Sequence, residues 1–242
     1  MKPKIVFSDF DGTLTLGEDL TPTFFKILDL LSKNNIDLIP VSGRSLSWGH
    51  FLLTHLNFKY AIMEGGGVMT YKDKLGFIRN HYLVTNDEIK NLEQFSKSLI
   101  KKFLGLELTA DSLGRVTDQA IELPLLSHMG IKSDVESFMN EKNIHHSTSS
   151  VHVNFWCGEI SKMRAIDHFL ACEREDVKLK ECVYFGDARN DQSCFLGFDH
   201  SVGVSNINAI LDDLTHKPSI VLEGDDKIGP LGVYSFLSDA LK

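Results

Sequence analysis

The chain has 242 residues, of which 43% are hydrophobic and 24% are charged, an ordinary balance for a globular protein with a buried core. Its formal net charge of −8 argues against nucleic acid as a partner, because phosphate contacts need clustered Lys and Arg. No apolar run approaches the ~20 residues of a membrane span, and Ser8 and Asp9 interrupt the first one too early for a signal peptide. The four cysteines lack CxxC spacing, which favours reduced thiols. We expect a cytoplasmic protein, monomeric or dimeric, without a membrane partner.

Strands and helices alternate along the first third of the chain. Thr21-Pro22 predicts a helix start, since Pro is well tolerated at the first helical position, and apolar residues then recur at helical spacing up to Asn34. The expected strands cover 4–8, 37–41 and 60–64, the expected helices 22–34 and 46–56, and a hairpin turns around 72–74. Strands separated by helices indicate parallel βαβ units.

The middle of the chain has a different character. Thr85-x-x-Glu88 is typical of a capping box, and we expect helices over 85–104 and 133–143 and strands over 116–123 and 150–156. The first pattern then resumes, with a helix over 162–172, strands over 182–185, 201–204 and 219–222, and a C-terminal helix. The predicted fold is α/β: a Rossmann-like parallel-sheet core formed by 1–81 and 158–242, with a smaller α/β domain inserted at 82–157.

Two carboxylates follow the first strand, in the segment Asp9-Phe10-Asp11-Gly12-Thr13. Side chains at i and i+2 of an extended chain point the same way, so both acids would lie at the carboxyl end of the strand, where open α/β sheets bind ligands. Such a pair requires a cation between the acids or a proton on one of them. A solvated turn or a calcium loop is the alternative, although Thr13 stands where a calcium loop needs its third oxygen ligand.

Three further segments place polar or charged residues at strand ends or helix starts. Ser42-Gly43-Arg44 follows the second strand, Lys162 lies near the start of a helix, and Gly186-Asp187 begins an acid-rich segment that ends in Asn190-Asp191. Lys162 alone would be an ordinary solvated residue, and Ser42 alone an ordinary helix cap. Their order along the chain is what makes them candidates for one site.

These segments, in this order, resemble the haloacid dehalogenase superfamily of phosphotransferases over essentially the whole chain. The insertion resembles the type II (IIB-like) cap of the branch that contains sugar-phosphate phosphatases and phosphomannomutases. The resemblance implies that Asp9 is a nucleophile that forms an aspartyl-phosphate, and that Asp11 protonates the leaving alcohol and later activates water. It also implies a Mg²⁺ site formed by Asp9, the backbone carbonyl of Asp11, and Asp187, with Asp191 holding a metal-bound water or orienting Asp187.

The resemblance assigns the phosphoryl oxygens to Ser42, the Gly43 amide and Lys162. Arg44 either binds phosphate or pairs with a core carboxylate. Asn190 either contacts substrate or caps the following helix. The implied substrate is a small, sugar-like phosphate ester that is hydrolysed with Mg²⁺ as cofactor. A mutase that returns the phosphoryl group, or a catalytically silent binding protein, is the alternative.

Along the strand expected at 150–156, apolar residues alternate with residues that carry a polar group. Val151, Val153 and Phe155 would face a helix layer, while His152, Asn154 and Trp156 would face either a substrate or plain solvent. On the neighbouring strand, three charged residues could add specificity or could pair on the surface: Arg115, Asp118 and Glu122. The sequence departs from the family pattern at Glu64-Gly65-Gly66, where an Asn often follows the Glu.

Overall fold

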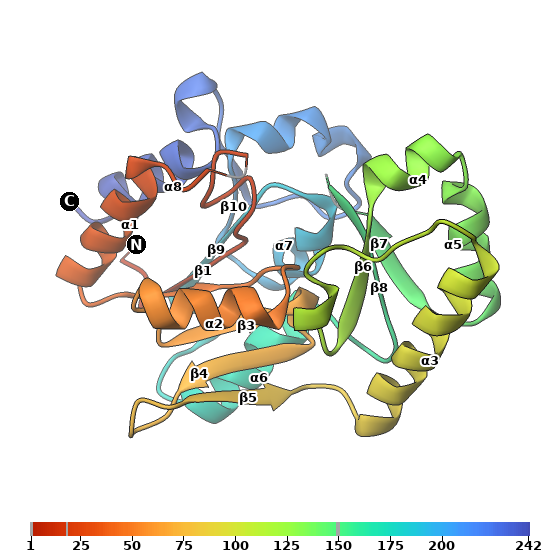
Figure 1. Cartoon of the computed structure of the whole chain (residues 1–242). Coiled ribbons are helices and arrows are strands. Elements are labelled where there is room, and N and C mark those ends of the chain that lie inside the picture. Colours follow the sequence, from red (N-terminus) through yellow and green to blue (C-terminus); the bar gives the residue numbers. More distant parts are fainter. Residues whose placement is uncertain (1, 18, 149–150) are drawn as a thin grey trace.

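The computed structural model describes residues 2–17, 19–148 and 151–242, and its centre is a parallel sheet (Figure 1). The five strands lie in the order β11-β10-β9-β1-β2, and every neighbouring pair is parallel. Their bounds are Ile5–Ser8 for β1, Asp37–Pro40 for β2, Cys182–Gly186 for β9, Ser201–Gly203 for β10 and Ile220–Val221 for β11. The predicted α/β class, with a Rossmann-like core and a smaller inserted cap, is confirmed.

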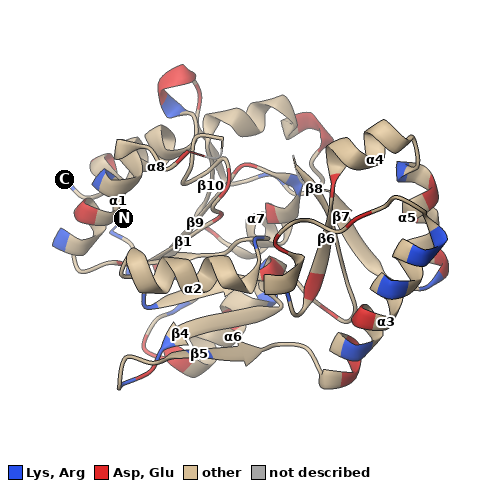
Figure 2. Ribbon diagram, in the orientation of Figure 1, with Lys and Arg blue, Asp and Glu red and all other residues tan. Residues whose placement is uncertain are grey.

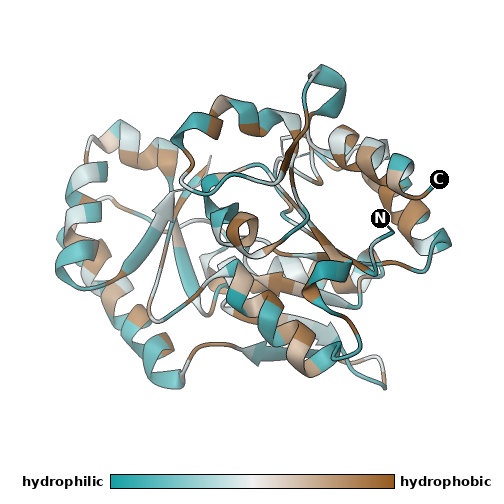
Figure 3. Cartoon of the chain, turned by 180° about the vertical axis from the view of Figure 1, so that it is seen from behind, coloured by the Kyte–Doolittle hydropathy of each residue, from teal (hydrophilic) through white to brown (hydrophobic). Residues whose placement is uncertain are grey.

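Helices cover both faces of this sheet, and the alternation along β1 decides what each face contacts. Val6 belongs to the apolar cluster formed with α1 (Pro22–Lys33), α2 (Leu46–His55) and α8 (Pro230–Ala240). Ile5 and Phe7 belong to the opposite cluster, with α6 (Lys162–Glu173) and α7 (Gln192–Gly197). Figure 3 shows the hydrophobic residues concentrated along these central strands. A residue that continues the series Ile5, Phe7 therefore lies on the α6 side of the sheet.

A second, antiparallel sheet extends the first. Strands β3 (Tyr60–Met63), β4 (Val68–Lys72) and β5 (Ile78–Tyr82) lie in sequence order, and β4 and β5 form the hairpin expected around 72–74. One parallel bridge, between Val41 and Ile62, joins β3 to the central sheet. The sequence pattern suggested β3 as a further parallel strand, but its regular partner is the antiparallel β4.

The inserted cap consists of a three-stranded antiparallel sheet, in the order β6-β8-β7, with helices on one face (Figure 1). Its elements are α3 (Asn86–Lys102), β6 (Asp118–Glu122), α4 (Leu123–Met129), α5 (Lys132–Glu141), β7 (His145–Thr148) and β8 (His152–Trp156). Phe95 of α3, Phe138 of α5 and Phe155 of β8 pack together in its apolar core. Sequence reasoning missed α4 and β7.

The surface of the cap carries both signs of charge, and Figure 2 shows Lys and Arg interspersed with Asp and Glu along α3 and α5. The capping box is present as expected: the Thr85 side chain accepts from the Glu88 N–H, and the Glu88 carboxylate accepts from the Thr85 N–H. Among the described residues, none of the helices combines the length and the apolar character needed to cross a bilayer. The four cysteines are free thiols.

Candidate active site

A buried ion pair lies where β1 ends. Asp9 continues the series Ile5, Phe7 and so lies on the side of α6, whose first residue is Lys162. The Lys162 ammonium donates to Asp9 Oδ1 at 2.6 Å and to Asp191 Oδ1 at 2.7 Å. Burial raises the pKa of Asp9 well above its usual value, although the charge of Lys162 opposes this. Burial alone would lower the pKa of Lys162, but Asp191 and Asp9 together raise it.

Asp191 is bound on both of its oxygens. Oδ1 also accepts from the Tyr184 hydroxyl at 2.6 Å, while Oδ2 accepts from the N–H groups of Asp187 and Ala188, each at 3.0 Å. The side chain is fully buried. With four donors on two oxygens, this carboxylate fixes both Lys162 and the loop that carries Asp187.

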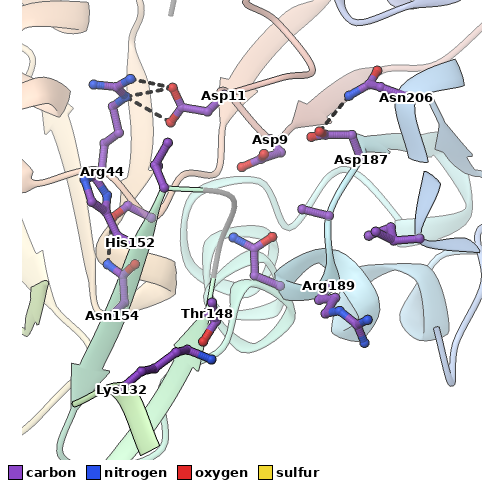
Figure 4. A pocket seen from close by; sticks show the side chains of 15 residues that line it. Asp9, Asp11, Arg44, Lys132, Thr148, His152, Asn154, Asp187, Arg189 and Asn206 are labelled. Carbon is purple, nitrogen blue, oxygen red and sulfur yellow. Dashed lines mark hydrogen bonds and ion pairs between the residues drawn. The ribbon is translucent and has the colours of Figure 1, made fainter. Parts of the chain in front are cut away.

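Asp187 faces β1 from the neighbouring strand end. Its Oδ1 accepts from the Thr13 hydroxyl at 2.7 Å, and its Oδ2 accepts from the Asn206 amide at 2.7 Å, which also donates to the Gly12 carbonyl (Figure 4). Gly12 has φ +77°, and a Cβ there would lie 2.5 Å from Asp187 Oδ2, so only glycine fits. Asn206 was missed from the sequence, although its place just after the expected strand 201–204 is a signal for this same edge of the sheet.

Three carboxylates at the ends of β1 and β9 are close enough together to bind one hard divalent cation. Asp9, Asp187 and Asp191 each offer an oxygen, and these oxygens lie within 4.8 Å of one another. Burial, with the negative charge of Asp191 next in size, raises the pKa of Asp187 to about 7. Crowded carboxylate oxygens of this kind suit Mg²⁺.

The Asp11 side chain points away from this acidic group and toward Arg44 (Figure 4). Arg44 Nε donates to both carboxylate oxygens at 2.9 Å, and Nη2 donates to Oδ1 at 2.6 Å. The guanidinium also lies 4.4 Å from the ring centre of Trp48, a cation–π contact. Of the two alternatives for Arg44, the structure shows the pairing with a core carboxylate.

A cavity of about 500 Å³ opens between the core and the cap above these acids. It brings together eight residues that the sequence singled out: Asp9, Asp11, Gly43, Arg44, His152, Asn154, Asp187 and Asn190. Lys162 lies in an adjoining pocket of about 130 Å³, while Ser42 is only 1% exposed. The carboxyl ends of β1, β2 and β9 thus meet the cap at one cavity, as the strand-end motifs predict.

The family model for haloacid dehalogenase-like hydrolases matches residues 6–119 and 127–217, most of the chain. The chain belongs to this family. No curated protein sequence matches the hydrolase. Three solved structures share its fold. Sucrose-phosphatase from Synechocystis sp. PCC6803 is 13% identical, with a TM-score of 0.69 and a match that covers 99% of this chain and 98% of that one. A putative HAD/COF-like hydrolase from Plasmodium vivax is 18% identical (TM-score 0.72; 100% of this chain and 97% of that one), and the phosphatase BT1666 from Bacteroides thetaiotaomicron is 14% identical (TM-score 0.69; 98% of this chain and 94% of that one).

The cap strand β8 presents its polar residues to the cavity of the hydrolase. Val153 and Phe155 are fully buried, while His152, Asn154 and Trp156 are partly exposed, which agrees with the expected alternation. His152 and Asn154 line the larger cavity, and Trp156 lines the smaller pocket.

Two other expectations for the cavity wall need correction. Val151 was expected to face the helix layer with Val153, but it is 40% exposed and lines the larger cavity, because it precedes the strand. Ser150, the expected first residue of this strand, lies outside the described residues. Asn190 caps no helix, since the cap positions are Ala188 and Asp191; its buried Oδ1 has no hydrogen-bond donor among the described residues.

The charged residues expected to pair on the cap surface are largely buried in the hydrolase. Arg115 donates to Asp118 Oδ1 at 2.7 Å and to the Gly43 carbonyl at 3.1 Å, and both charged side chains are at most 3% exposed. Glu122 is the exception, with Oε2 3.3 Å from His152 Nε2 near the surface. Surface pairing was therefore wrong for Arg115 and Asp118, because the cap packs on the core at this point.

Glu64 of the hydrolase, at the position of the family's Glu, also joins core to cap. Its fully buried carboxylate accepts from Leu46 N at 2.9 Å, from Thr117 N at 2.6 Å and from Thr117 Oγ1 at 2.7 Å. Leu46 begins α2, and Thr117 directly precedes β6. An acid between an apolar strand and three glycines was a signal for a special role, but the sequence does not show which amides it binds.

Proposed function

We propose that this hydrolase is a Mg²⁺-dependent phosphatase that cleaves a small phosphomonoester through an aspartyl-phosphate on Asp9. One observation carries the proposal: Lys162 binds Asp9 through Oδ1 only, and no described residue donates a hydrogen bond to Oδ2. A buried carboxylate held in this way, with one oxygen toward a cavity, is arranged for nucleophilic attack.

In the first half-reaction, Asp9 Oδ2 attacks phosphorus, and the bond between phosphorus and the ester oxygen breaks. Asp11, which takes up a proton from water when it leaves Arg44, gives that proton to the departing oxygen, which leaves as an alcohol. Asp11 also lines the cavity, so as the substrate enters its carboxyl group leaves Arg44 and forms a hydrogen bond with the ester oxygen that will depart. One difficult displacement thereby becomes two easier ones.

In the second half-reaction, the Asp11 carboxylate takes a proton from water as the water oxygen attacks phosphorus. The bond between phosphorus and Asp9 breaks, and inorganic phosphate and the Asp9 carboxylate result. The same acid serves both steps, first as proton donor and then as base.

Charge on the phosphoryl group is balanced by Lys162, the Ser42 hydroxyl and the Gly43 amide, which act on oxygens that gain charge in the transition state. Mg²⁺ would be held by Asp9, Asp187 and the Asp11 carbonyl, and when bound it would offset the negative charge of phosphate and carboxylates alike. The four donors on Asp191 favour an orienting role for this residue.

We further propose a sugar-like leaving group and a cytoplasmic protein. The polar face of β8 borders the cavity, where His152 supplies a hydrogen-bonding group suited to hydroxyls. Sucrose-phosphatase, a structural relative, was solved with sucrose and phosphate. The free thiols agree with a reducing compartment.

The test is phosphate release from sugar phosphates and p-nitrophenyl phosphate, with Mg²⁺ and with EDTA, for the wild type and Asp9→Asn. We expect release that requires the metal and falls at least 10³-fold in the variant, because the nucleophile is removed. Retained turnover in a folded Asp9→Asn protein would exclude Asp9 as nucleophile. Transfer of phosphate to a second hydroxyl, without release, would indicate a mutase instead.

A further inference from the structure

The cap binds the loop that we assign to the phosphoryl group. Arg115 Nη1 donates to the Gly43 carbonyl at 3.1 Å, and Asn154 Nδ2 donates to the same oxygen at 3.4 Å. Gly43 belongs to the core loop after β2, whereas both donors belong to the cap. Two cap side chains thus converge on one carbonyl oxygen of the core.

That carbonyl belongs to a peptide group that is held at its other end as well. The N–H of Arg44, in the same planar unit, donates to Ser42 Oγ at 3.1 Å. Because Ser42 Oγ accepts this bond, its own hydrogen is directed elsewhere, and in our proposal it is directed to the phosphoryl group. The orientation of the Gly43–Arg44 peptide therefore restricts the directions in which the Ser42 hydroxyl can donate.

The cap donors are themselves rigid. Asp118 bridges them, since its Oδ1 accepts from Arg115 at 2.7 Å and its Oδ2 accepts from Asn154 at 2.9 Å. Asp118 is 2% exposed, and the Arg115 side chain is 1% exposed. Glu64 holds the adjacent backbone through Thr117. Because Arg115 and Asp118 are buried and ion-paired and Asn154 is hydrogen-bonded to Asp118, the cluster couples the position of the cap rigidly to the loop.

Resting on the proposed function, we propose that Arg115, Asp118 and Asn154 are positioning residues that complete the phosphate loop from the cap. They act through the Gly43 carbonyl, so that the loop donors are fully oriented only while the cap lies on the core. This assigns Asn154 to the loop, where the sequence suggested a substrate contact. The cap then controls the rate of phosphoryl transfer in addition to admitting substrate.

Substrate contacts and positioning residues differ in the range of substrates that they affect. A residue that contacts the leaving group affects only substrates that carry that group, whereas a residue that orients the phosphate loop affects every ester by the same factor. We expect Asn154→Ala to lower kcat about tenfold on a sugar phosphate and on p-nitrophenyl phosphate alike, with KM changed less than threefold.

Hydrogen exchange gives a second readout that does not depend on turnover. The Arg44 amide, which donates to Ser42 Oγ, should exchange about tenfold faster in Asn154→Ala, because the peptide has lost one of its two cap donors. His146→Ala is the control, since it removes a cap hydrogen bond to Asn140 away from the loop and should leave kcat and exchange within twofold. Asn154→Ala carries the test because Arg115→Lys opens a buried ion pair and risks unfolding the cap.

A tenfold loss on all esters with faster exchange supports the proposal. A loss confined to the sugar phosphate would make Asn154 a substrate contact and overturn it, as would kcat within twofold of wild type on every ester. If the wild type releases no phosphate at all, the proposed function fails, and the exchange rate of Arg44 alone decides whether the cap orients the loop.

Discussion

Replacing Glu64 by Gln tests how strongly one carboxylate joins cap to core. Its Oε1 accepts from Leu46 N at 2.9 Å, its Oε2 accepts from Thr117 N at 2.6 Å and from Thr117 Oγ1 at 2.7 Å, and Val116 N lies 3.2 and 3.1 Å from the two oxygens. Gln has one acceptor oxygen, so its NH₂ group must face a backbone N–H that the carboxylate bound. The substitution keeps the size of the side chain and changes only its charge and donors.

The expected cost follows from these contacts. Losing one hydrogen bond to a charged acceptor costs about 1.5–3 kcal/mol, and leaving one buried N–H unsatisfied costs about 1–3 kcal/mol. We therefore expect Glu64→Gln to lower the free energy of unfolding by about 3–5 kcal/mol, or Tm by roughly 6–20 °C for a chain of this size. Urea unfolding followed by circular dichroism measures the difference directly.

Glu122→Gln is the matched control for this measurement. Its side chain is 47% exposed, and the same chemical change there should stay within about 0.5 kcal/mol. A loss below about 1 kcal/mol for Glu64→Gln would refute the reasoning, because it would show that the cap backbone finds other acceptors when the carboxylate is removed.

Lys162→Met leaves Asp9 and Asp191 facing each other without their shared cation, so the free energy of unfolding in EDTA should fall by about 3–5 kcal/mol and recover in part with millimolar Mg²⁺; an unchanged urea midpoint would contradict the buried pair. Burial raises the pKa of Asp118 from 3.8 to about 7 against the charge of Arg115, with Glu64 adding to the rise. The folded protein then binds more protons than the unfolded chain between these values, so stability should fall as pH rises from about 4 to 7, by up to about 4 kcal/mol. Asp118→Asn should remove the Asp118 share of that slope and leave the shares of Asp9 and Asp187, whose pKa values are also raised; equal slopes in the two proteins would disprove the assignment. Gly12→Ala places a Cβ 2.5 Å from Asp187 Oδ2 and should lower kcat at least tenfold in a folded protein, as phosphate release will show; Gly76→Ala, also at positive φ but with no atom within 4 Å, isolates the backbone cost.

Local signals in the sequence were sufficient for the main elements and for the acids. Pro22 begins α1, Thr85 caps α3, and the apolar run before Asp9 forms the central strand β1. Each of these features depends on residues within a few positions of one another. The α/β class and the strand-end position of the acids therefore followed from short windows of sequence.

Features that depend on distant partners could not be predicted in this way. β7 (His145–Thr148) has no apolar residue, so no periodicity marks it, and it forms because β8 offers a free edge. α4 is short and begins Leu123-Pro124, which resembles a turn. Arg115 resembles a surface residue until the core loop is packed against it, and its burial arises from a contact 72 positions away in sequence.

The order of strands in the central sheet has a consequence for how the chain acquires its structure. β1 lies between β2 and β9, and Ile5 pairs with Cys182, a residue made 177 positions later. At synthesis rates of about 5–20 residues per second, one edge of β1 stays unpaired for roughly 10–35 s. The apolar core of the cap, by contrast, is contained within residues 92–157. During translation the cap can therefore become compact first, while β1, which directly precedes Asp9, still lacks one of its two neighbouring strands. The unpaired edge of Ile5–Ser8 is open to aggregation during that interval.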